Sequence, residues 1–144
     1  MGQQQLLLLV LGIVIVGLAV VVGIQAFSEN QKKANADALV NDAIRIASDA
    51  QAWMLKPTAF GGGGNSCGTG TCDWSTLTFS QLGYAVASGV YTNLNGNFEL
   101  DVSTATQVVI TGTNAANDNQ VEVTVTGTTP QEIATVVTTD YTGS

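Results

Sequence analysis

The chain has 144 residues, of which 45% are hydrophobic and only 10% are charged, and its formal net charge is −7 at pH 7. This length allows one modest folded domain beside a long helix. Residues 57–144 contain seven acids and no Lys or Arg, so this part repels nucleic acid and we expect no nucleic-acid partner.

The first segment, residues 1–28, carries no charged side chain. Its centre, from Leu6 to Ile24, is a run of 19 apolar or glycine residues. As a helix with a rise of about 1.5 Å per residue, this run is about 28 Å long, which is close to the thickness of a bilayer core. The sequence therefore predicts an apolar helix over residues 1–28 that is able to cross a membrane.

Three interpretations of this segment remain open. A cleavable signal peptide is disfavoured, because Gln3, Gln4 and Gln5 stand where a basic region belongs and the apolar run is long. We expect Met1 to be the start of the helix itself. A simple membrane anchor fits better. We favour the third interpretation, a helix that sits in the membrane and later packs into the core of a filament.

The next segment, residues 29–56, is predicted to continue the same helix in amphipathic form. It has no Pro or Gly before Pro57, so we expect one helix over residues 3–55 that approaches 80 Å. Acids and bases balance here, and we expect Arg45 to pair with Asp42 and Asp49 along the helix. The apolar positions recur at helical spacing: Ala36, Val40, Ala43, Ala47, Ala50 and Met54, with Leu39, Ile46 and Trp53 alongside.

Residues 60–72 are predicted to be a loop, in which the glycines 61–64 form a flexible linker. Cys67 and Cys72 are the two cysteines of the chain, and they follow this run. A chain without histidine offers too few ligands for zinc, so we expect a local disulfide, which contributes about 2 kcal/mol. A disulfide places the head outside the cytoplasm, although Lys32 and Lys33 favour the opposite orientation by the positive-inside rule.

The remainder of the head, 57–144, is predicted to contain four antiparallel strands. They cover Phe98–Val102, Val108–Thr111, Val121–Thr126 and Ile133–Thr138, with turns at residues 95–96, 112–119 and 127–130. The first and third of these strands alternate apolar and polar residues, so we expect the sheet to have one apolar face. The amphipathic part of the helix is the large element available to cover it, which predicts an α+β fold.

Catalytic chemistry is poorly represented in the head. It has no histidine, no base and no expected free thiol, so we expect neither an enzyme nor a cofactor. Glu99 and Asp101 on one strand are the pattern of solubilising acids. The loop 114–120 offers oxygen ligands for calcium but lacks the EF-hand pattern, and we expect no metal site. The aromatic residues are few and scattered in the sequence.

This order of elements resembles the type IV pilins and their pseudopilin relatives. In that family, an apolar N-terminal helix continues as an amphipathic helix that packs on a small β head with a disulfide. The resemblance implies that Met1 is the first residue of the mature helix and that Gln5 occupies the position of a family glutamate. The family proline within the membrane is missing, and Gly17 or Gly23 can take its place.

The resemblance implies a main subunit of a type IV pilus-like filament for adhesion, motility or surface contact. The alternatives are a pseudopilin of a secretion system and a monomeric, membrane-anchored binding module. The expected partners are other copies of the chain, membrane lipid before assembly and the pilus assembly machinery. The residues expected in the filament core are Met1, Gln5, Leu6, Leu9, Gly12, Val16, Gly17, Ala19 and Gly23, of which Ala19 and Gly23 form a small patch for close helix packing.

Overall fold

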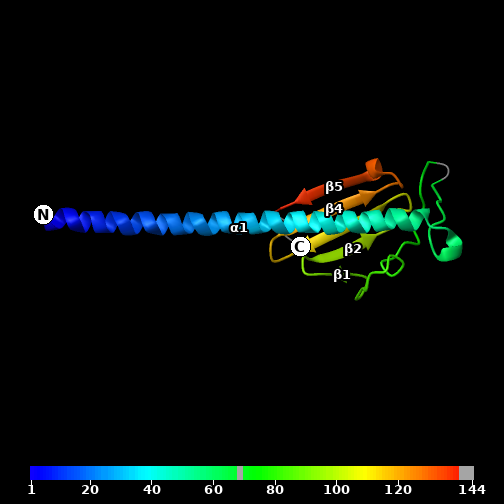
Figure 1. Ribbon diagram of the computed structural model, residues 1–144, viewed down its shortest axis with the longest axis horizontal. Helices are drawn as coiled ribbons and strands as arrows, with labels where there is room; N and C mark the ends of the chain where they lie inside the picture. Colours follow the sequence, from blue (N-terminus) through cyan, green and yellow to red (C-terminus); the bar gives the residue numbers. More distant parts are fainter. Residues whose placement is uncertain (68–69, 140–144) are drawn as a thin grey trace.

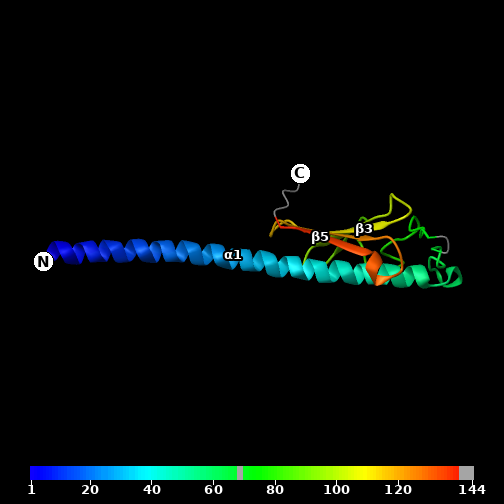
Figure 2. The same ribbon diagram turned by 90° about the horizontal axis from the view of Figure 1, so that it is seen from above.

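One long helix with a small sheet packed against its C-terminal half makes up the computed structural model, which describes residues 1–67 and 70–139. Figure 1 shows the N-terminal half of the helix projecting alone, while the head lies beside the other half. The view in Figure 2 shows that helix and sheet form two layers. The predicted α+β class is therefore confirmed.

Helix α1 covers Gly2–Leu55, 54 residues, and is about 80 Å long. It runs without interruption through Gly12, Gly17 and Gly23, so the helix of the single chain has no break at Gly17 or Gly23. The helix ends where predicted, because Pro57 disfavours a helical backbone at the residue before it. Lys56 accordingly adopts an extended conformation, with φ −73° and ψ 134°.

The prediction of a flexible glycine linker after α1 is not supported, because these glycines fold back onto the end of the helix. The last carbonyl groups of a helix lack partners within the helix. Here the N–H of Gly63 donates to the carbonyl of Trp53 at 3.0 Å, and the N–H of Asn65 donates to that of Met54 at 2.6 Å. A Cβ on Gly63 would lie 2.8 Å from the Met54 sulfur, so only glycine allows this close approach. The run caps the helix, with a short 3-10 turn, η1 (Thr58–Phe60), between the two.

The sheet is an antiparallel meander in the order β1-β2-β3-β4-β5. Its strands are β1 (Tyr91–Thr92), β2 (Asn97–Asp101), β3 (Val108–Asn114), β4 (Asn119–Val125) and β5 (Ile133–Thr138), with the 3-10 turn η2 (Pro130–Glu132) before β5. The prediction of four strands missed β1. A strand of two residues is too short to show alternation, and it forms only because the turn at 93–96 returns it alongside β2.

Strand β3 is three residues longer than predicted, because Gly112 continues the strand instead of starting a turn. Gly112 lies opposite Phe98 in the register of β2 and β3. A Cβ at this position would lie 2.7 Å from the Phe98 ring, so the glycine makes room for a buried aromatic side chain. A glycine inside a strand marks such a close approach.

The core lies between α1 and the inner face of the sheet, as the apolar periodicity predicts. The buried helix residues are Ala36, Leu39, Ala43, Ile46, Ala47, Ala50, Trp53 and Met54. They pack against alternate residues of the strands, which are Phe98, Val108, Ile110, Val121, Val123 and Val125. The segment before β1 completes the core with Trp74, Leu77 and Phe79, although it has no regular secondary structure. Burying each large apolar side chain stabilises the fold by about 1.5–3 kcal/mol.

Candidate functional site

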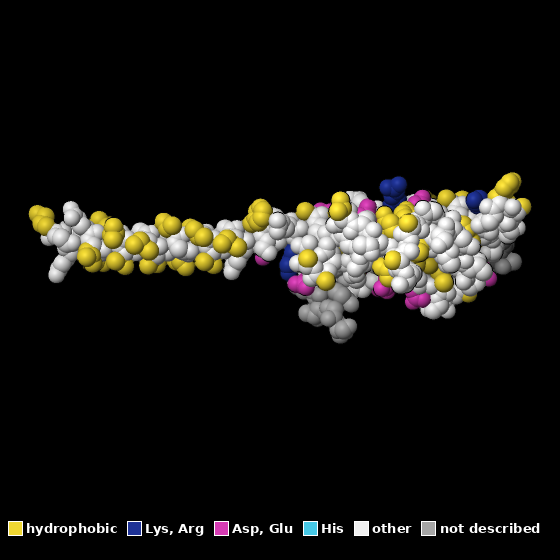
Figure 3. Space-filling view, turned by 90° about the horizontal axis from the view of Figure 1, so that it is seen from below, with side chains coloured by type: hydrophobic (Ala, Val, Ile, Leu, Met, Phe, Trp, Pro, Cys, Tyr) yellow, Lys and Arg dark blue, Asp and Glu magenta, His cyan; other side chains and the backbone are white. Residues whose placement is uncertain are grey.

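The N-terminal half of α1 is exposed over its whole length. Residues 1–31 are all exposed, and each large apolar side chain from Leu6 to Phe27 keeps 51–69% of its surface accessible. Figure 3 shows this apolar rod, in yellow, extending beyond the head. In the described part of the chain, α1 is the one helix long and apolar enough to cross a membrane, with a mean hydropathy of 3.2 in its most apolar window. So large an apolar surface requires lipid or other apolar helices around it.

The residues predicted for the filament core do not all share one face of this rod. Each residue of a helix is rotated by about 100° from the one before it. Five of the predicted residues therefore fall within an arc of about 60°, and they are Gln5, Gly12, Val16, Ala19 and Gly23. Leu9 lies at the edge of this arc, whereas Leu6 and Gly17 lie on a different side of the helix.

This arc carries mostly small side chains, and it points away from the side of α1 that the head covers. The patch predicted from Ala19 and Gly23 thus extends to Gly12. A shallow hollow around Gly12 is lined by Leu8, Leu9, Gly12, Ile13, Val16 and Gly17. A hollow with small residues lets the backbone of another helix approach closely. Met1 and Gln5 lie at the free end, and both are exposed.

At the end of the head nearest this rod, α1 is held by asparagine side chains. Asp42 accepts hydrogen bonds from Nδ2 of Asn93 at 2.8 Å and from Nδ2 of Asn95 at 2.7 Å. The fully buried Asn119 donates to the backbone carbonyl of Lys32 at 2.7 Å. Asp42 was predicted to pair with Arg45, and that prediction is wrong. The sequence feature that could have indicated these contacts is the concentration of Asn in the turns at 93–96 and 114–119.

At the middle of the head, Asp49 was predicted to pair with Arg45, but its hydrogen-bond partner is Tyr84. The hydroxyl of Tyr84 donates to Oδ2 of Asp49 at 2.5 Å. Burial raises the pKa of Tyr84 well above its usual range, and the hydrogen bond and charge of Asp49 raise it further. The sequence positions of the aromatic residues predicted that they are scattered, but four of them form a cluster. The ring centroids of Tyr84 and Tyr91 are 4.8 Å apart, and both rings pack with Phe79. Within this cluster, the ring of Phe98 packs with that of Tyr91.

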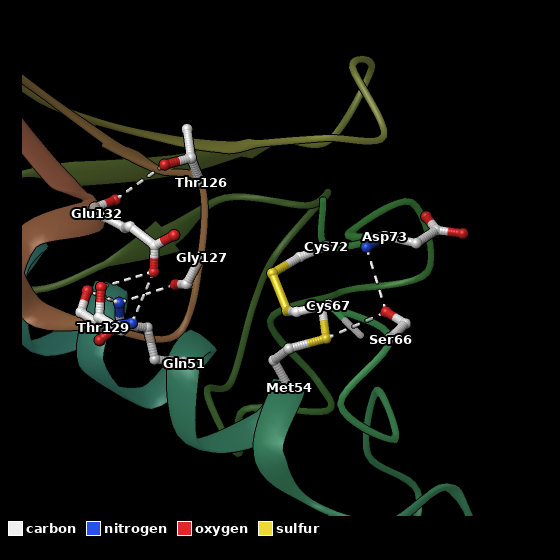
Figure 4. The surroundings of a disulfide bond; sticks show 10 residues. All are labelled: Gln51, Met54, Ser66, Cys67, Cys72, Asp73, Thr126, Gly127, Thr129 and Glu132. Carbon is white, nitrogen blue, oxygen red and sulfur yellow. Dashed lines mark hydrogen bonds between the residues drawn. A yellow bond between two sulfur atoms is a disulfide. The ribbon is translucent and has the colours of Figure 1, made fainter. Parts of the chain in front are cut away.

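At the far end of the head, the predicted disulfide between Cys67 and Cys72 is present, with Cα atoms 3.9 Å apart. Figure 4 shows it beside the end of α1. The hydroxyl of Ser66 donates to the Met54 sulfur at 3.3 Å and accepts from the backbone N–H of Asp73 at 3.2 Å. The disulfide loop is thereby attached to the helix.

The connection between β4 and β5 is attached to α1 at the same end. Gln51 donates to the carbonyls of Gly127 and Thr129, each at 2.9 Å (Figure 4). Glu132 accepts from the backbone N–H and the hydroxyl of Thr129, and these bonds lower the pKa of Glu132. Three sets of contacts along α1 therefore hold the head in one position on the helix.

The acids that the sequence singled out are distributed over the head. Glu99 and Asp101 lie in β2 and are exposed, and the loop predicted as a calcium candidate is the turn between β3 and β4. Among residues 1–67 and 70–139, no group of three or more His, Cys, Asp or Glu side chains is placed to hold a metal ion.

Comparisons with family models, with curated proteins and with solved structures returned no match. The exposed rod and its attachment to the head are the structural features that bear on function.

Proposed function

We propose that this chain is the main structural subunit of a type IV pilus-like filament at the cell surface. The observation that carries the proposal is the exposed run from Leu6 to Ile24, in which no residue packs against the head. The subunit is inserted in the membrane before assembly, with the head outside the cytoplasm. It then leaves lipid and packs against the helices of other copies.

The chemistry of the rod supports this exchange. Nineteen residues without a charge can pass from lipid to neighbouring helices at little hydrophobic cost, because both surroundings are apolar. The small residues around Gly12 and Gly23 permit close helix packing. The disulfide supports a head in an oxidising compartment. The acidic surface of the head supports filaments that stay soluble and separate. The assembly machinery extrudes the subunit, and the filament serves adhesion, motility or surface contact.

Electron microscopy of material sheared from producing cells tests the proposal, with Leu9→Asp and Val16→Asp as variants. We expect thin filaments from the wild type and none from either variant, because a carboxylate in an apolar helix bundle is strongly unfavourable. Leu9→Met keeps an apolar side chain of similar volume and is expected to assemble. Extraction of membranes with alkaline carbonate shows whether each variant still inserts.

Normal filaments from either charged variant would show that the exposed rod does not form the core of the filament. Absence of filaments from wild-type cells, with the protein retained in the membrane fraction, would favour an anchored binding module or a pseudopilin.

A further inference from the structure

A polar groove lies where the apolar rod meets the head. Its volume is about 420 Å³, and its lining residues are Gln25, Ser28, Glu29, Lys32, Lys33 and Thr139. The helix residues recur at intervals of three and four, so they form one face of α1. Thr139, beyond the end of β5, supplies the opposite wall. We propose that this groove binds the headgroup of a phospholipid that carries both a phosphate and a primary ammonium, such as phosphatidylethanolamine.

The position of the groove along α1 supports a lipid as the ligand. Gln25 follows the last residue of the apolar run, and Lys33 lies about 14 Å beyond that run. The headgroup layer occupies the first 5–8 Å or so beyond the bilayer core. Helix side chains lean toward the N-terminus, and the long stems of lysines reach back toward the interface. When Leu6–Ile24 spans the bilayer, the groove lies at the height of the headgroups.

The charges of the groove match a zwitterion better than an anion. Lys32 and Lys33 supply ammonium groups for the phosphate, and Glu29 supplies a carboxylate for the lipid ammonium. Nζ of Lys32 lies 3.7 Å from Oδ2 of Asp118, which attaches it to the turn between β3 and β4. Figure 3 shows acidic and basic side chains together where the rod enters the head. A primary ammonium donates up to three hydrogen bonds, and Glu29 and Ser28 offer acceptors for them.

The acyl chains of a lipid held in this groove extend along the exposed rod. They lie on the same side of α1 that packs against the head in its C-terminal half. The small-residue arc around Gly12 lies on another side of the helix. One bound lipid therefore leaves that arc open. The inference depends on the membrane-inserted stage of the proposed function, but not on assembly of the filament.

Lipid binding to the full-length chain tests the inference. The protein is purified in mild detergent and titrated with phosphatidylethanolamine, phosphatidylglycerol or phosphatidylcholine, and native mass spectrometry counts the bound lipids. We expect one phosphatidylethanolamine per chain, bound about fivefold more tightly than the other two lipids. Glu29→Gln should abolish the preference for phosphatidylethanolamine, and Lys33→Gln should weaken binding of both ethanolamine and glycerol lipids about fivefold.

Lys56→Gln is the matched control, because Lys56 is an exposed lysine at the far end of the helix. It should change no affinity. Equal binding of all three lipids, or a preference for phosphatidylglycerol, would overturn the inference. Competition by soluble glycerophosphoethanolamine at equal concentration would show that the groove recognises a free headgroup and not a lipid. Filaments on cells together with equal binding of the three lipids would contradict this inference but not the proposed function. Selective binding of phosphatidylethanolamine without filaments would contradict the proposed function but not this inference.

Discussion

Tyr84 makes the stability of the head sensitive to high pH. Burial, and next its hydrogen bond to Asp49, raise the pKa of this phenol above its ordinary value of 10.0, although the charge of Arg45 opposes the shift. The folded protein therefore holds the phenolic proton more tightly than the unfolded chain. This contribution to stability is complete below pH 10 and is lost as the pH rises from 10 toward the raised pKa of the folded state.

We expect the thermal midpoint of the wild type to fall more steeply above pH 10 than that of Tyr84→Phe. Fluorescence of the buried Trp53 and Trp74 reports unfolding of the head in detergent. Tyr91→Phe is the control, because its aromatic ring packs in the same cluster without the bond to Asp49. Parallel curves for the wild type and Tyr84→Phe would show that the buried phenol does not determine the alkaline limit.

At the scale of single elements, β3 depends on the pairing of Gly112 with Phe98. A methyl group on Gly112 would meet the ring at 2.7 Å, so Gly112→Ala should lower the free energy of unfolding by about 1–3 kcal/mol. Phe98→Leu shortens the opposing side chain. In the double variant, the loss should be smaller than the sum of the two single losses by about 1 kcal/mol. Additive losses would mean that the destabilisation by Ala at 112 does not arise from contact with the Phe98 ring.

The two halves of α1 divide the molecule into an exposed apolar rod and a head that contains the buried core. No residue before Ala36 is buried, so the apolar half contributes no side chain to the core. We expect residues 29–144 to fold alone as a soluble monomer, with the helix 29–55 stabilised by the sheet and not by its own propensity. Circular dichroism and sedimentation measure this. The thermal midpoint should lie within a few degrees of that of the full chain, and an unfolded or aggregated fragment would contradict the division.

Particular residues show how far local patterns extend. The periodicity from Ala36 to Met54 identified the covered face of α1, and Pro57 marked its end, because helix geometry repeats along a sequence. The cysteine spacing identified the disulfide. The sequence did not indicate that Asp42 binds Asn93 and Asn95 instead of Arg45. A partner 51 residues away along the chain leaves no local pattern, and Arg45 was the nearest base.

The sequence by itself determined the apolar run from Leu6 to Ile24, the continuation of one helix to Leu55, and most of the strands. These features follow from periodicity and from chain breakers, which act over a few residues. Only the tertiary structure decided that the glycines after Pro57 cap the helix, that Gly112 stays within a strand, and that Glu29, Lys33 and Thr139 line one groove. Each of these depends on how separate segments of the chain approach one another in three dimensions, and packing, not local preference, controls that approach.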